Sequence, residues 1–130
     1  MKKNVFFYLW PNYSDKVGFG HLRRLKNIST ALKKEKIKYN LILTKNKDSL
    51  KLKIKKLLYI NRTINNFDSK NFSKNFFRKE KRKFIIFDNY QLTNNILSKF
   101  KNMGYKTIYF SDNPKRKFKV DLNIYLGNKI

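Results

Sequence analysis

The sequence predicts an α/β protein with a parallel sheet flanked by helices, and two observations lead to this class. Short, continuously apolar runs at residues 4–10 and 84–87 are typical of strands that are buried on both faces of a parallel sheet. Such runs alternate with amphipathic stretches of ten or more residues, as in strand–helix–strand units with right-handed crossovers. The 130 residues, 41% of them hydrophobic, suffice for one core, so we expect a single domain over residues 1–130.

The first half of the chain predicts two strands and two helices. The aromatic run at 4–10 predicts a strand, and 11–19, with its proline, asparagine and glycines, predicts a loop. In 20–36 the apolar residues recur at three- and four-residue steps, which predicts an amphipathic helix with lysines on its outer face. We expect a second strand at 39–44 and a second helix at 48–58.

The second half begins with the least legible segment, 61–83, which is rich in asparagine and lysine and predicts a loop with a short helix near 72–77. The apolar run 84–88 predicts a strand that ends in an acid. The pattern of 92–103 predicts a helix, which Gly104 would close because glycine readily adopts the left-handed conformation at a helix end. The remaining elements that we expect are a strand at 105–110, a turn at 111–114 and a short strand at 121–126.

The formal net charge of +24 has two interpretations. A polyanionic partner, either nucleic acid or an anionic membrane surface, would explain it by function. A coding bias would explain it without function, because 26 of the 32 basic residues are lysine and 17 further residues are asparagine, both encoded by A- and T-rich codons. The lysines are spread along the whole chain, which favours the second interpretation.

Composition argues against several classes of function. The chain has no cysteine and one histidine, so it predicts no disulfide framework, no thiolate chemistry and no transition-metal site. The apolar run that follows Lys2 and Lys3 is too short for a secretory signal, and no segment approaches the ~20 apolar residues of a membrane span. We therefore expect a cytoplasmic protein that uses neither a metal nor a cofactor.

Polar residues follow three of the predicted strands. They form the loop 12–24, the sequence Asp88-Asn89-Tyr90 and the sequence Ser111-Asp112-Asn113. The carboxyl ends of parallel strands lie at one edge of a sheet, where open α/β proteins bind their ligands. We therefore expect these three segments to line one site.

The sequence VGFGHLRR, residues 17–24, holds the only histidine, His21. Gly18 and Gly20 would let backbone N–H groups approach a ligand, and the helix that follows presents its positive end there. That position favours the neutral imidazole that a general base requires. A turn followed by a helix that happens to begin at His21 explains the same residues without function, and the third glycine of a dinucleotide-binding loop is missing.

Asp88 and Tyr90 each allow two interpretations. A carboxylate after a buried strand binds a ribose or sugar hydroxyl, or it caps the next turn. Tyr90 donates a hydrogen bond in a pocket, or it is an ordinary half-buried aromatic residue. No catalytic triad and no glycosidase-like pair of carboxylates can be assembled from the sequence.

The segment VGFGHLRRLKNISTALKK resembles the Gly-x-Gly-His-x-x-Arg motif of the sugar-nucleotide hydrolases of pseudaminic acid biosynthesis and of related polysaccharide-biosynthesis proteins. FIIFDNYQL is similar to that family's strand ending in Asp-His-Tyr. YKTIYFSDNPKRKFKVDLNIYLGN is similar to its next strand, acidic turn and following strand. The resemblance covers nearly the whole chain in the same order.

This resemblance implies a metal-independent glycosyltransferase-B-type fold, in which a Rossmann-like N-terminal sheet faces the sugar and a C-terminal domain grips the nucleotide. His21 matches the histidine that activates water for attack at the anomeric carbon and so releases UDP from a UDP-sugar. Tyr90 matches a tyrosine that contacts or supports the sugar. The residues that match substrate-binding positions are Gly18, Gly20, Arg24, Asp88, Asn89 and Asp112.

Two departures from the family pattern concern the substrate and the length. Trp10-Pro11-Asn12 stands where the family has Arg-x-Asp, and Asn89 stands in place of a histidine, so the sugar or the activity would differ. The chain stops where the family's first domain stops, so we expect the nucleotide-binding domain to be absent from this chain and to come from a longer protein or a partner chain. The isolated chain would then be nearly inactive.

A function of another class stays open beside the enzyme. Aromatic residues interleave with lysines in 71–84, as in proteins that bind nucleic acid through charge and stacking. The alternative is therefore a basic module that binds nucleic acid or an anionic membrane surface without catalysis.

Overall fold

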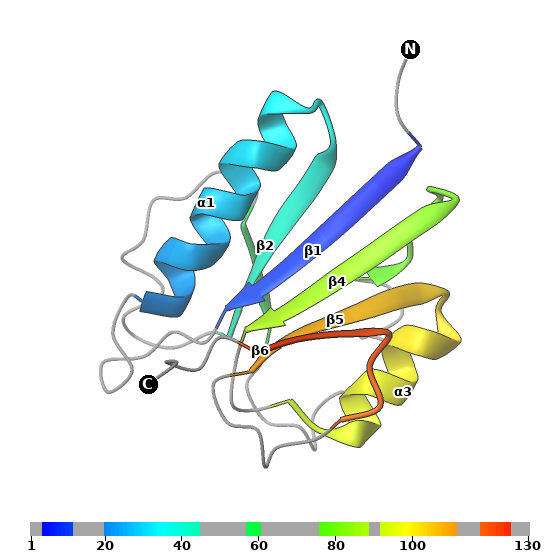
Figure 1. Ribbon diagram of the computed structural model, residues 1–130. Coiled ribbons are helices and arrows are strands. Elements are labelled where there is room, and N and C mark those ends of the chain that lie inside the picture. Colours follow the sequence, from blue (N-terminus) through cyan, green and yellow to red (C-terminus); the bar gives the residue numbers. More distant parts are fainter. Residues whose placement is uncertain are drawn as a thin grey trace.

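The computed structural model describes residues 4–11, 20–44, 57–60, 76–88, 92–111 and 118–125. Each of these parts contributes one strand to a single sheet (Figure 1). In chain order the elements are β1 (Val5–Pro11), α1 (Gly20–Lys34), β2 (Lys38–Thr44), β3 (Leu57–Ile60), β4 (Arg82–Asp88), α3 (Asn94–Asn102), β5 (Tyr105–Ser111) and β6 (Leu122–Tyr125).

Six parallel strands form this sheet in the order β3-β2-β1-β4-β5-β6. The chain starts in the middle, adds β2 and β3 on one side, and continues with β4, β5 and β6 on the other. This is the strand order of doubly wound α/β proteins. Helix α1 packs on β1 and β2, and α3 packs against β5 from the opposite side of the sheet (Figure 1). The predicted α/β class, with a parallel sheet flanked by helices, is confirmed.

Strand β1, at the centre of the sheet, has a continuous run of apolar and aromatic residues because both of its faces are covered. Successive side chains of a strand point to opposite sides of the sheet. On β1, Leu9 packs with Leu25 of α1, whereas Tyr8 and Trp10 belong to the cluster that contains Phe100 of α3. The continuous apolar run at residues 4–10, which predicted a doubly buried strand, has this physical origin.

The α3 side of the sheet is an aromatic core centred on Phe100, which is fully buried. The centroid of its ring lies 5.0 to 6.4 Å from those of Phe76, Tyr105, Phe87 and Trp10, in edge-to-face geometry. Each such aromatic pair stabilises a fold by about 0.5–1.5 kcal/mol beyond the burial of its area. Phe100 therefore joins β1, β4, β5 and the segment before β4.

Helix α3 begins two residues later than the predicted start at 92 and ends at Asn102, just before the predicted stop at Gly104. The Thr93 hydroxyl oxygen accepts a hydrogen bond from the Ile96 backbone N–H at 3.2 Å and so caps the first turn. At the other end Gly104 has a φ of 88°, in the left-handed region where a side chain brings strain. A Cβ added there would also lie 3.3 Å from the Lys83 Nζ atom, which would have to shift by a few tenths of an ångström, so the positive φ is the main reason for glycine at this turn.

Tyr8 and Tyr105 place two phenol groups inside the aromatic core. The Tyr105 hydroxyl donates a hydrogen bond to the Phe76 carbonyl oxygen at 2.5 Å, which fastens the segment before β4 to β5. Burial is the main cause that raises the pKa of both hydroxyl groups above their ordinary value of 10.0.

These two phenols predict a loss of stability in alkaline solution. In the unfolded chain they ionise near pH 10.0, whereas in the folded protein they keep their protons, so the unfolded state binds fewer protons above that pH. Each group then lowers the free energy of unfolding by up to about 1.4 kcal/mol per pH unit, and contributes no pH dependence below its unfolded pKa. Urea denaturation at several pH values should show a shallower alkaline decline for Tyr105→Phe than for the wild type. An identical decline in the two proteins would contradict the assignment.

One predicted element is wrong where the structure describes it. Residues 57 and 58, the end of the helix expected at 48–58, instead belong to β3, which pairs in parallel with β2. Four consecutive apolar residues suit a short buried strand, but Leu57 and Leu58 also fit the helical spacing of the lysine-rich stretch before them. Residues 48–56 lie outside the described part of the chain.

Smaller differences concern the ends of elements. Strand β4 begins at Arg82 instead of Phe84, and Ser111 is the last residue of β5 instead of the first residue of a turn. Of the short helix expected near 72–77, the structure describes the last two residues, and Phe76 is helical whereas Phe77 is not.

Candidate functional site

The candidate site lies at the carboxyl edge of the sheet, where β1, β4 and β5 end. Pro11 at the end of β1 is the register partner of Asp88 at the end of β4, and Ser111 ends β5. Helix α1 begins at this same edge with Gly20, beside the arrowheads of β1 and β4 (Figure 1). Each of the three segments predicted to share a site therefore has a described residue at this edge.

An ion pair between Arg24 and Asp88 joins the helix to the sheet at this edge. The guanidinium Nε donates to Asp88 Oδ2 at 2.6 Å and Nη2 donates to Oδ1 at 2.5 Å, so the two planar groups meet through paired hydrogen bonds. Bonds of this kind between charged groups are stronger and more directional than neutral ones. They fix the start of α1 relative to the end of β4.

Burial of this pair is unequal. Asp88 is fully buried, whereas the Arg24 side chain is 34% exposed. The guanidinium carbon also lies 5.7 Å from the centre of the Phe110 ring, within the range of a cation–π contact. Arg24 therefore holds a partly exposed positive group at the sheet edge, and the buried carboxylate of Asp88 fixes the orientation of that group.

This pairing is a third role for Asp88, beside the two interpretations that the sequence allowed. Asp88 follows Ile86 and Phe84 at alternate positions of β4, on the side of the sheet that α1 covers. Its carboxylate is bound by an arginine of that helix, so it positions a second candidate residue. Both residues had been singled out separately, and the structure brings them together.

His21 lies in the first turn of α1, three residues and about one helical turn ahead of Arg24. The backbone N–H groups of a first turn carry no intrahelical partners and bear the positive end of the helix dipole, which attracts anionic groups. Gly20, the first residue of the helix, is at the same place. The side chain of His21 lies outside what the structure describes.

The other predicted site residues also lie outside the described part of the chain. They are Gly18, Asn89, Tyr90 and Asp112. Within the described ranges, no three histidine, cysteine or acidic residues come together as a metal site. No helix in those ranges is both long and apolar enough to cross a membrane.

The strand order and the polar carboxyl edge define a doubly wound α/β protein with one candidate ligand site at that edge. Comparisons of the chain with protein-family models, with curated proteins and with solved structures found no match.

Proposed function

We propose that the chain is the sugar-facing domain of a nucleotide-sugar hydrolase or a related glycosyltransferase-like enzyme of bacterial surface-glycan synthesis. The observation that carries the proposal is the Arg24–Asp88 pair. It joins the arginine of the Gly-x-Gly-His-x-x-Arg segment to the strand-end acid, two parts of the resemblance that lie 64 residues apart. A glycosyltransferase-B-type architecture is part of the same proposal.

The chemistry that we assign to this edge is hydrolysis at an anomeric carbon without a metal. His21 takes a proton from water, the water oxygen bonds to the anomeric carbon, and the bond from that carbon to the UDP oxygen breaks. UDP leaves with the electron pair, and a free sugar is the other product. The first turn of a helix favours a neutral imidazole, which is the form that accepts this proton.

The other candidate residues bind and orient in this proposal. Arg24, held by Asp88 and partly exposed, offers a positive group to the anionic substrate. Backbone N–H groups near Gly18 and Gly20 approach the substrate, and Tyr90, Asn89 and Asp112 contact the sugar.

The proposal predicts a large loss of turnover for His21→Ala. We expect kcat for UDP release from the family's UDP-linked diacetamido sugar to fall by about a hundredfold or more, as general-base catalysis typically contributes. The enzyme to assay is the complete protein that contains this chain, together with any partner that co-purifies with it. Arg23→Ala, an exposed change on the same helix, is the matched control and should keep its turnover.

Two outcomes would count against this function. Full turnover of the His21→Ala protein would remove the assigned role of the histidine. If no UDP-sugar is consumed, and the chain instead binds nucleic acid with an affinity that falls steeply with salt and ignores His21→Ala, the non-catalytic alternative holds.

A further inference from the structure

The α1 side of the sheet is covered over only part of its width. Helix α1 packs on β1 and β2 and reaches the carboxyl ends of β4 and β5 through Arg24, but among the described residues no helix covers that side of the remaining parts of β4 and β5 or of β6 (Figure 1). Parallel sheets of this kind are normally covered by helices on both faces. Over this half of the face, which we call the bare half, the described residues supply no covering layer.

Apolar side chains form the floor of this bare surface. Phe84 stacks on Phe7 of the α1 side at 4.7 Å between ring centroids, and Ile108 packs against the core cluster under α1. Leu122 of β6 is the register partner of Ile108 and is 50% exposed. A cavity of about 520 Å³ lies over these three side chains, and we call it the β4–β6 trough.

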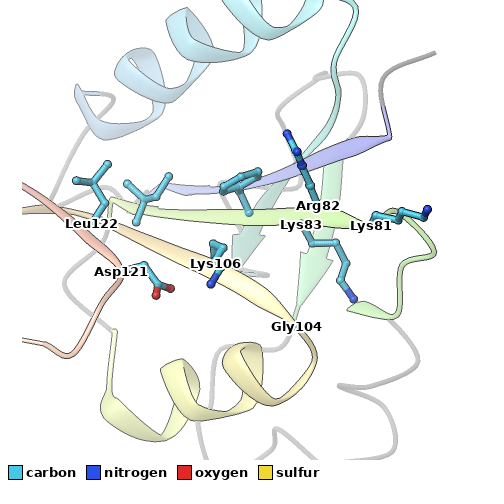
Figure 2. A pocket seen from close by; sticks show the side chains of 9 residues that line it. Lys81, Arg82, Lys83, Gly104, Lys106, Asp121 and Leu122 are labelled. Atoms are coloured by element: carbon cyan, nitrogen blue, oxygen red, sulfur yellow. The ribbon is translucent and has the colours of Figure 1, made fainter. Parts of the chain in front are cut away.

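Basic side chains form the rim of the trough. Lys81, Arg82 and Lys106 are exposed and line the cavity (Figure 2). Figure 2 shows Lys81 and Arg82 at one end and Leu122 at the other. The trough therefore combines an apolar floor with a positively charged rim.

Asp121 is the one acidic residue among the described residues that line the cavity, and its carboxylate is engaged within the sheet. Its Oδ2 accepts hydrogen bonds from the Thr107 backbone N–H at 2.8 Å and from the Thr107 hydroxyl at 3.0 Å. These bonds lower the pKa of the Asp121 carboxyl, since they favour its charged form. They also hold β6, and with it Leu122, against β5.

The dimensions of the trough suit a helix. Neighbouring strands are ~4.8 Å apart, so a position two strands away from α1 is displaced by about 10 Å. Packed helices lie at this separation, which is also about the diameter of a helix with its side chains. A second helix beside α1 would thus rest over β4 and β5, directly on Phe84 and Ile108.

We propose that the β4–β6 trough binds an amphipathic helix of another protein, with an apolar face toward Phe84, Ile108 and Leu122 and acidic residues toward the basic rim. The positive charge of the rim favours a partner with acidic residues. A second copy of a chain with a net charge of +24 would bring like charges together. The chain's own segments 45–56, 61–75 and 112–117 each carry more basic than acidic residues.

A membrane surface fits the shape less well than a helix does. Helix α1 stands about 10 Å above the sheet, so a flat bilayer that touches α1 does not reach the apolar floor beside it. This inference does not depend on the function proposed for the carboxyl edge, which involves other residues.

The test uses a fluorescently labelled synthetic peptide of about 18 residues, or five helical turns, with leucines on one face and glutamates on its flanks. A second peptide has lysines in place of the glutamates. Fluorescence anisotropy with the whole chain should show micromolar binding of the acidic peptide and none of the basic one. Lys106→Glu and Leu122→Glu should each weaken the acidic peptide's binding at least about tenfold.

Matched controls separate this surface from general charge and general apolar contact. Lys33→Glu, on the exposed side of α1, and Phe77→Glu, at an aromatic residue that is 74% exposed, should leave the affinity nearly unchanged. Thermal unfolding of each variant identifies any that fails to fold, and Lys106→Glu, at an exposed position, keeps the test available if Leu122→Glu does fail.

Three results would overturn the proposal. One is the absence of binding by the acidic peptide, and another is an equal loss of its binding in the control variants. The third is binding to phosphatidylserine vesicles that Leu122→Glu abolishes while the peptide does not bind, which would assign the trough to a membrane.

Discussion

Phe100→Ala is expected to lower the free energy of unfolding by about 3–5 kcal/mol, the range for truncating a buried aromatic residue. The ring is fully buried and packs edge-to-face on four other rings, so its removal leaves a cavity bordered by β1, β4 and β5. Loss of this size is a large share of the stability of an ordinary small domain. Urea denaturation followed by circular dichroism measures it.

Phe77→Ala is the matched control for this change. The side chain of Phe77 is 74% exposed, so its truncation should alter the free energy of unfolding by no more than about 0.5 kcal/mol. If the two substitutions had equal effects, the aromatic cluster around Phe100 would not be the core of this domain.

Arg24→Ala is expected to be the second most damaging change, with a loss of about 2–3 kcal/mol in the free energy of unfolding. It removes two charge-assisted bonds from a carboxylate that is fully buried. Breaking a fully buried pair costs more, but Arg24 is 34% exposed and solvent screens part of the interaction. Arg23→Ala, on the exposed neighbour, should cost less than about 0.5 kcal/mol.

A double-mutant cycle tests whether the pair itself is responsible. Asp88→Asn should cost less than Arg24→Ala because it leaves no buried charge behind, and the two changes should be strongly non-additive. Additive effects, or equal effects of Arg23→Ala and Arg24→Ala, would contradict a stabilising ion pair at this edge.

Much of the fold followed from local patterns because both faces of β1, at the centre of the sheet, are covered. β1 and the part of β4 at 84–87 are continuous apolar runs, and α1 and α3 repeat their apolar residues at helical spacing. β3 was missed because four residues are too few to show a period of their own beside a helix-like stretch. The hydrogen bond from the Tyr105 hydroxyl to the Phe76 carbonyl oxygen could not be predicted from the sequence, since it depends on tertiary packing.

The candidate site was predicted in outline. Parallel topology was enough to place Arg24 and Asp88 at one edge of the sheet. Their pairing was not predicted, because a strand-end carboxylate has several common partners and sequence gives no distance between residues 64 positions apart. The unequal covering of the α1 side also had no signal, because Phe84 and Ile108 have the same residue types as buried core positions.

The central position of β1 has a consequence for synthesis on the ribosome. Val5 at the start of β1 pairs with Arg82, and Pro11 pairs with Asp88, so β1 lacks one neighbour until β4 has been made. Contacts between residues so distant in sequence form slowly, and an apolar strand waiting for its partner is prone to aggregate. The nascent chain therefore carries an exposed strand edge until β4 has been made, so a chaperone at the ribosomal exit tunnel should increase the yield of folded protein.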